Sequence, residues 1–148
     1  IFANPVQDMA GRPTEVARPG MALARGRVVV APGEGHLCVE LSGGMPRVRI
    51  SQERVESGCL PSVDPMLASV ADTFGTAGLG IVLSGMGRDG LRGAERMAAA
   101  GADVFVQDRD TSVVWGMPGT VAAAGLATAM LPPIQMAELL VRRDRVAA

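Results

Sequence analysis

The chain has 148 residues, which is enough for one domain with a core of its own. Its 14 basic and 15 acidic residues leave a net charge of −1, so no electrostatic attraction favours DNA, RNA or an anionic membrane as a partner. No apolar run is long enough to span a membrane and no signal sequence opens the chain, so we expect a soluble protein without membrane insertion. Because the first residue is Ile1 and not a methionine, we also expect that upstream sequence is missing.

The first third of the chain is rich in glycine and proline. Residues 1–26 show no sustained periodicity, which predicts an irregular lead-in. Three short β-rich runs follow at 27–31, 36–41 and 47–51, and the turns between them contain glycine and proline. This spacing predicts an antiparallel β-meander.

A helix and then a buried strand are predicted in the middle of the chain. Ser62 is the expected N-cap of the helix and Gly75 its stop. The residues between them that recur at helical spacing, and that we expect to be buried, are Val63, Met66, Leu67, Val70 and Phe74. Residues 79–84 are apolar until the last position, as in a strand covered on both faces of a parallel sheet.

The same alternation continues to the C-terminus. A helical stripe ends at Gly101, residues 102–107 form a second strand of the buried type, and Pro118 begins a short helix that stops at Gly125. Pro133 begins the last helix, whose expected inward residues are Ile134, Ala137, Leu140 and Val141. Strands that alternate with helices predict a layered α/β sheet.

The cysteine content indicates a reducing compartment. Cys38 and Cys59 have no Cys-x-x-Cys spacing, and a single pair is a thin framework for a secreted domain of this size. We therefore expect two reduced cysteines and a cytoplasmic protein. These cysteines and His36, the only histidine, are one conceivable zinc set, but their spacing does not fit one. We predict core packing for them, and neither a metal nor a cofactor.

Residues 84–90, with the sequence SGMGRDG, carry the most chemical information. They connect a predicted strand to a predicted helix, and their three glycines, Gly85, Gly87 and Gly90, have the Gly-x-Gly-x-x-Gly spacing of dinucleotide-binding loops. Asp89 opposes that interpretation because its carboxylate stands where a pyrophosphate would bind at the helix N-terminus. From the residues alone three interpretations stay open: a structural turn with Asp89 as a cap, a carboxylate that orients a catalytic histidine, and a nucleotide site.

Several motifs together carry a resemblance to a known family. They are PSVD at 61–64, IVLSGMGRDG at 81–90, AGADVFVQD at 100–108 and SVVWGMP at 112–118, and VVVAPGEGHL at 28–37 is also similar. In order and spacing they resemble the chemotaxis protein-glutamate methylesterases, the CheB family, over about 120 residues. The resemblance implies that residues 1–148 are a single, partial methylesterase catalytic domain, with 27–148 as the family-like region, and that its sheet is doubly wound and mostly parallel.

The resemblance also implies an activity. The family hydrolyses γ-glutamyl methyl esters on the cytoplasmic helices of chemoreceptors, deamidates receptor glutamines, and uses a serine, a histidine and an aspartate. Asp89 is the counterpart of that aspartate, and the main-chain N–H of Met86 is the counterpart of an oxyanion-hole donor. The implied roles agree with what such groups do, since the aspartate orients and stabilises the imidazolium while the N–H meets the developing oxyanion.

The chain also departs from the family pattern. The family nucleophile lies in a Gly-Ala-Ser turn and its base in a His-Met-Pro motif, and neither sequence is present. We therefore expect the C-terminal portion of a catalytic domain, inactive by itself; the alternative is a non-catalytic fragment that binds a receptor or another protein. As local substitutes, Ser84 is better explained as support for the turn, Ser62 as a helix cap and His36 as a non-catalytic residue.

The remaining expectations concern the surroundings of Asp89. The residues expected at the rim of the active site are Ser84, Gly85, Gly87, Trp115 and Met117. For Trp115, the only tryptophan, packing is the simpler role. Arg88 and Arg92 flank Asp89 in sequence and are expected on a solvated face. The implied partners are methylated chemoreceptor helices and a phosphoacceptor receiver domain, which commonly precedes the catalytic domain in the family.

Overall fold

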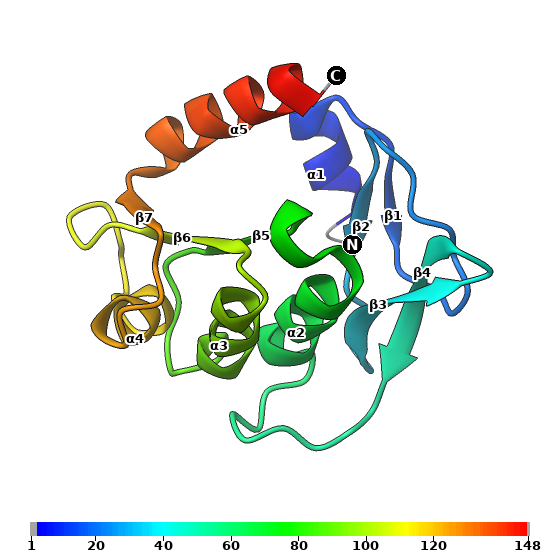
Figure 1. Cartoon of the computed structure of the whole chain (residues 1–148), viewed down its shortest axis with the longest axis horizontal. Helices are drawn as coiled ribbons and strands as arrows, with labels where there is room; N and C mark the ends of the chain where they lie inside the picture. The colour runs from blue at the N-terminus through cyan, green and yellow to red at the C-terminus, as the bar shows by residue number, and fades with distance from the viewer. Residues whose placement is uncertain (1–2, 148) are drawn as a thin grey trace.

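The structure is a computed structural model that describes residues 3–147, and the side chains of residues 5–143 (Figure 1). The elements, in chain order, are α1 (Ala3–Ala10), β1 (Thr14–Val16), β2 (Val28–Val30), β3 (His36–Ser42), β4 (Met45–Ser51), α2 (Val63–Phe74), the 3₁₀ turn η1 (Gly75–Ala77), β5 (Leu79–Val82), α3 (Leu91–Ala99), β6 (Asp103–Gln107), α4 (Met117–Ala123), β7 (Ala129–Leu131) and α5 (Pro133–Ala147). None of the helices in these residues is both long enough and apolar enough to cross a membrane.

The main sheet is parallel and has the strand order β5-β6-β7. In Figure 1, α2, α3 and α4 lie on one side of this sheet and α5 runs along the other. The predicted mixed α/β class is thereby confirmed. The strand β7 was not predicted, because three residues are too few for a period to show.

The N-terminal third differs from its prediction. The lead-in at 1–26 is not irregular throughout, since it contains α1 and β1. The antiparallel part of the prediction holds for β3 and β4, which pair through a turn at Gly43 and Gly44, both with positive φ as a tight hairpin requires. The run at 27–31 instead contributes β2, which pairs in parallel with β1. Because the three residues of β1 show no period, this strand was not predicted, and β3 was therefore the expected neighbour of β2.

Two hydrophobic clusters form the core. The larger lies between the main sheet and the helices α2, α3 and α4, and its buried members are Leu67, Ala71, Val82, Ala94, Met97, Ala102, Val104, Val106 and Val121. The smaller joins Ala17, Leu37 and Val48 beneath the β3–β4 hairpin. Met66 packs against both clusters, so α2 connects the hairpin to the sheet.

The helix α2 has the boundaries that the sequence predicts. The hydroxyl of Ser62 accepts a hydrogen bond from the Asp64 main-chain N–H, which satisfies one of the free donors of the first turn. At the other end Gly75 has a φ of 52° and terminates the helix. Ser62 thus fixes the N-terminus of α2, which lies at the candidate site, and Gly75 fixes its C-terminus.

The orientation predicted for α5 is wrong. Ile134 is 75% exposed and Val141 52%, whereas Met136 is buried. Apolar residues occur on nearly every side of this helix, at 134, 136, 137 and 139–141, so periodicity alone does not select a buried face.

Candidate active site

The turn that follows β5 is bound to the loop before α4. The main-chain N–H of Ser84 donates to Oε1 of Gln107 at 2.8 Å, and the Ser84 hydroxyl accepts from the Val114 N–H at 3.0 Å. The role predicted for Ser84, support for the turn, is therefore what the structure shows. Its hydroxyl is engaged with the main chain and is not poised as a nucleophile.

Close main-chain contact continues along the same pair of loops. The carbonyl of Gly85 accepts from the N–H groups of Gly116 at 3.2 Å and Met117 at 2.8 Å. A Cβ at Gly116 would lie 2.7 Å from that carbonyl oxygen, and a Cβ at Gly85 would lie 2.6 Å from the Met117 sulfur. Glycine at 116 is thus a packing requirement, because its neighbours are main-chain atoms, whereas a side chain at 85 would displace the Met117 side chain. Trp115 packs its indole against Gly119, where a Cβ would lie 2.6 Å from Nε1.

The tip of the turn presents its backbone to solvent. Gly87 and Gly90 have φ values of +90° and +98°, a conformation that favours glycine. Between Gly85 and Gly87, Met86 is 83% exposed. Among the described residues, 3–147, no partner accepts a hydrogen bond from the Met86 main-chain N–H. This donor is available to a ligand.

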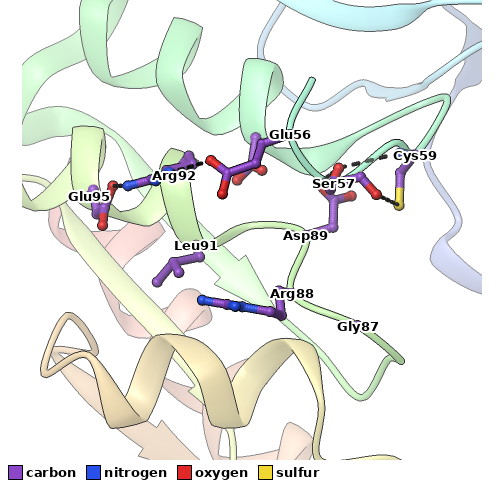
Figure 2. A pocket seen from close by; sticks show the side chains of 10 residues that line it. Glu56, Ser57, Cys59, Gly87, Arg88, Asp89, Leu91, Arg92 and Glu95 are labelled. Carbon is purple, nitrogen blue, oxygen red and sulfur yellow. Dashed lines mark hydrogen bonds and ion pairs between the residues drawn. The ribbon is translucent and has the colours of Figure 1, made fainter. Parts of the chain in front are cut away.

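Asp89 is buried and bound from three directions. It is 5% exposed, and it lines a cavity of about 510 Å³ together with Ser57, Gly87 and Arg92 (Figure 2). Its Oδ1 accepts from the hydroxyls of Ser62 at 2.5 Å and Ser57 at 3.1 Å, and its Oδ2 accepts from the Val63 main-chain N–H at 2.9 Å. Three hydrogen bonds of this kind fix the orientation of the carboxyl group.

The helices α2 and α3 exchange their N-terminal caps. Asp89, which precedes α3, binds the first N–H of α2, while Asp64 in α2 accepts from the Gly93 N–H of α3 at 2.8 Å. The interpretation of Asp89 as only a cap of the helix that follows it, one of the three left open by the sequence, is therefore wrong, because Asp64 binds that helix end. Burial raises the pKa of Asp64, and the negative charge of Asp89 raises it further. Since a carboxylate already binds the N-terminal amides of α3, the dinucleotide interpretation loses its phosphate site.

His36 and the two cysteines differ in their burial and in their hydrogen bonds. His36 is 1% exposed and both of its ring nitrogens are bonded, Nδ1 to the Ser62 N–H and Nε2 to the Glu53 carbonyl, each at 2.9 Å. Cys38 is buried in β3, whereas Cys59 is exposed in the loop before α2. No group of three metal-ligating side chains occurs within the described residues.

The surrounding charges are mostly paired. Figure 2 shows Arg92 between Glu56 and Glu95, with N–O distances of 2.9 and 3.0 Å. The hydrogen bond from Arg92 is the main reason why the pKa of Glu56 is lowered. Arg88 is exposed at the mouth of the same cavity and belongs to no ion pair within the described residues. The expected solvated face therefore describes both arginines, although Arg92 is tied to its neighbours.

The sequence identified some site residues and missed others. Of the five predicted rim residues, Gly87 lines the Asp89 cavity, whereas Trp115 lines a neighbouring one of about 600 Å³. Ser84 and Gly85 lie in the turn, and Met117 is the first residue of α4. Ser57, and the bond from the Ser62 hydroxyl to Asp89, were missed. The sequence marked Ser62 as a helix cap and as part of the PSVD motif but not as a partner of Asp89, and nothing in a polar loop singles out Ser57.

Comparison with known proteins identifies the family of the chain. Residues 1–140 match the CheB methylesterase family. The chain is 41% identical over 142 residues to protein-glutamate methylesterase/protein-glutamine glutaminase 1 of Rhodospirillum rubrum and 40% identical over 146 residues to enzyme 2 of that name in Caulobacter vibrioides. These alignments cover 96% and 98% of this chain but only 37% and 41% of the relatives, so the chain spans less than half the length of either.

A solved structure shows the same fold. The catalytic domain of the Thermotoga maritima CheB methylesterase superposes with a TM-score of 0.91 at 28% sequence identity, and the match covers 95% of this chain and 74% of that one. The family match spans most of the chain, and the sequence relatives and the structural neighbour agree with it. The chain therefore belongs to the CheB methylesterase family.

Proposed function

We propose that this chain supplies the aspartate and the oxyanion-binding turn of a protein-glutamate methylesterase, which hydrolyses γ-glutamyl methyl esters and deamidates glutamines on the cytoplasmic helices of chemoreceptors. The observation that carries the proposal is the turn at 84–90. One residue of it, Asp89, is a buried carboxylate in a cavity, and another, Met86, presents an unbonded main-chain N–H. The names of the relatives support the substrate class.

Each group has a defined task in this proposal. Asp89 accepts a hydrogen bond from the catalytic histidine, which holds the imidazole in the tautomer that can take a proton from the nucleophile. The Met86 N–H donates to the oxygen that becomes negative when the ester carbonyl is attacked. Because a main-chain N–H carries no side-chain entropy, the turn is preorganised for this role.

The chain by itself lacks a base for this reaction. Its only histidine, His36, is buried with both ring nitrogens bonded to the protein. The Gly-Ala-Ser and His-Met-Pro motifs of the family are also not in the sequence. We therefore expect that the 148-residue polypeptide releases no methanol from methylated receptor. Robust turnover by this polypeptide would contradict the assignment of roles.

A chimera tests the assigned roles directly. In it, this chain replaces the matched 74% of the Thermotoga maritima domain, and the rest of that domain is expected to supply the serine and the histidine. The chimera should release methanol, and Asp89→Asn should lower kcat by about 10⁴-fold. Asp108→Asn, an acidic residue that follows β6 and does not line the Asp89 cavity, is the matched control. A chimera that is folded by circular dichroism and yet inactive would refute the proposal.

The oxyanion donor has a test of its own. Met86→Ala keeps the main-chain N–H and should leave kcat within a few-fold of the parent. Met86→Pro removes that N–H and should lower kcat by about 10² to 10³-fold. Equal activities of the two variants, with equal thermal stability, would exclude Met86 from the oxyanion hole.

A second candidate is a binding module without catalysis, favoured by the engagement of the sole histidine. In that case the isolated chain binds receptor helices, or a receiver domain, without hydrolysing the ester. Isothermal titration of the chain with a methylated receptor fragment measures this binding. Binding by the chain together with an inactive, folded chimera would favour the module over the enzyme.

A further inference from the structure

The two oxygens of the Asp89 carboxylate are not equivalent. Oδ1 accepts two hydrogen bonds, from the hydroxyls of Ser62 at 2.5 Å and Ser57 at 3.1 Å, whereas Oδ2 accepts one, from the Val63 N–H at 2.9 Å. A carboxylate oxygen accommodates about two donors. Oδ1 is therefore saturated by the protein, and Oδ2 is the atom that retains an acceptor position.

The hydroxyl of Ser62 has its direction fixed by its neighbours. Its oxygen accepts from the Asp64 N–H at 3.2 Å, and the residue is 5% exposed, so water does not compete for its proton. Because the oxygen already serves as an acceptor on the α2 side, its O–H is directed at Asp89. One serine thus begins α2 and binds the carboxylate at the same time.

His36 accepts a hydrogen bond from the main-chain N–H of Ser62. A peptide N–H can only donate, so Nδ1 of His36, 2.9 Å from the Ser62 nitrogen, must be the unprotonated acceptor. The ring proton then lies on Nε2, which donates to the Glu53 carbonyl at 2.9 Å. The imidazole is neutral, 1% exposed and bonded at both nitrogens, which makes it an anchor and not a reactant.

We propose that Ser57 and Ser62 are positioning residues that saturate Oδ1 of Asp89, so that the N–H of the catalytic histidine can bind only Oδ2. His36 positions Ser62 in turn, through the main-chain N–H of that residue. The effect of these residues on catalysis rests on the proposed function, whereas the hydrogen bonds to Asp89 are given by the geometry of this chain. A simple helix cap needs only the bond to the Asp64 N–H, and the 2.5 Å bond to the carboxylate is additional.

The chain offers a matched control for Ser62. Ser69 lies on the same helix, is 8% exposed, accepts from the Val39 N–H at 2.9 Å and donates to the Met66 carbonyl at 2.8 Å. Ser62→Ala and Ser69→Ala each remove one buried hydroxyl with two hydrogen bonds. Both should lower the thermal stability, whereas only Ser62→Ala should alter Asp89.

The first readout is spectroscopic and uses the 148-residue chain. In ¹³C-labelled protein at neutral pH, Ser62→Ala should shift the Asp89 side-chain carboxyl signal, Ser69→Ala should leave it unchanged, and Ser62→Thr, which retains a hydroxyl, should restore it. Long-range ¹H–¹⁵N spectra should show His36 protonated at Nε2 only. An Asp89 signal that is the same in the parent and in Ser62→Ala, or a His36 protonated at Nδ1, would overturn the inference.

The second readout is kinetic and uses the chimera. Loss of one charge-assisted hydrogen bond that orients the carboxylate should lower kcat by about 10-fold to 100-fold with KM unchanged. Ser62→Thr should recover most of this loss, and Ser69→Ala should keep the parent kcat. If the parent chimera is inactive, the proposed function fails while the carboxyl signal still decides the positioning role. If the parent is active and Ser62→Ala matches Ser69→Ala, the positioning role fails while the function stands.

Discussion

Substitution of Gly116 by alanine should displace the turn that carries the candidate site. The added Cβ would lie 2.7 Å from the Gly85 carbonyl oxygen and 2.9 Å from the Gly87 nitrogen. The shorter distance falls 0.7 Å below the 3.4 Å at which ordinary contact begins (3.4 Å less 2.7 Å). Both neighbours are main-chain atoms, so relief requires movement of the 84–90 turn and not a change of rotamer.

The energetic effect of Gly116→Ala follows from two opposing contributions. Overpacking against backbone costs about 1–3 kcal/mol. Gly116 has a φ of −89°, so alanine suffers no left-handed strain, and its restriction of the unfolded chain returns about 0.4–1 kcal/mol. The central values of the two contributions, about 2 and about 0.7 kcal/mol, leave a net loss in the free energy of unfolding of about 1.3 kcal/mol. For a domain of this size, that loss lowers Tm by about 3–5 °C.

Thermal unfolding and the amide spectrum of the turn measure these effects together. Gly33→Ala is the control, because its Cβ would meet nothing within 4 Å and its φ is not positive. Gly116→Ala should lower Tm and shift the amide signals of Gly85 and Met86, whereas Gly33→Ala should do neither. An unchanged Tm with unshifted amides at 85 and 86 would show that the loops are not in the close contact described above.

Three further predictions concern the core and the titratable groups. A thiol reagent should label Cys59 rapidly in the folded chain and Cys38 only after unfolding. Burial hides the sulfur of Cys38 from the reagent and raises the pKa of its thiol. Rapid labelling of both cysteines in the folded chain would contradict the buried position of Cys38. In urea titrations, Met97→Ala, at a fully buried side chain, should lower the free energy of unfolding by about 2–5 kcal/mol. Ile134→Ser, at an exposed side chain, should change it by less than about 0.5 kcal/mol. A large effect at Ile134 would show that this side chain is covered. Burial raises the pKa of Asp64 above the usual 3.8, so just above that pH the folded chain binds more protons than the unfolded one. The free energy of unfolding therefore falls there as the pH rises. Urea titrations from pH 4 to 7 should show this fall in the parent and not in Asp64→Asn, and parallel pH profiles of the two proteins would contradict it.

Repeating apolar patterns and capping chemistry predicted the C-terminal two thirds of the fold well. Ser62 and Gly75 bound α2 as expected, and the apolar run at 79–84 contains β5. Such signals are local, since a cap or a continuous apolar run is legible within a few residues. Strands of three residues, such as β1 and β7, are too short to carry a period, and the meander was mispredicted for that reason.

The candidate site was predictable only where its residues share one segment. Asp89 and Met86 lie in a single motif, and the structure buries the first and exposes the second. The donors to Asp89 come from residues 57, 62 and 63, about thirty positions earlier, and no sequence spacing predicts which oxygen each one binds. The buried face of α5 was predicted wrongly for a different reason, because apolar residues occur on several sides of this helix and do not select one face.

The exchange of caps explains why the PSVD and GMGRDG segments act as one unit. Asp89 binds the N-terminus of α2 and Asp64 binds the N-terminus of α3, so each helix depends on a carboxylate from the other. The helices approach so closely that a Cβ at Gly93 would lie 2.7 Å from the Leu67 Cβ and 2.9 Å from the Asp64 carbonyl oxygen. Glycine at 93 is therefore needed for the position of the carboxylate, although it touches no part of the cavity. A shift of α3 relative to α2 would move Asp89 away from its donors, which ties the geometry of the site to the packing of the core.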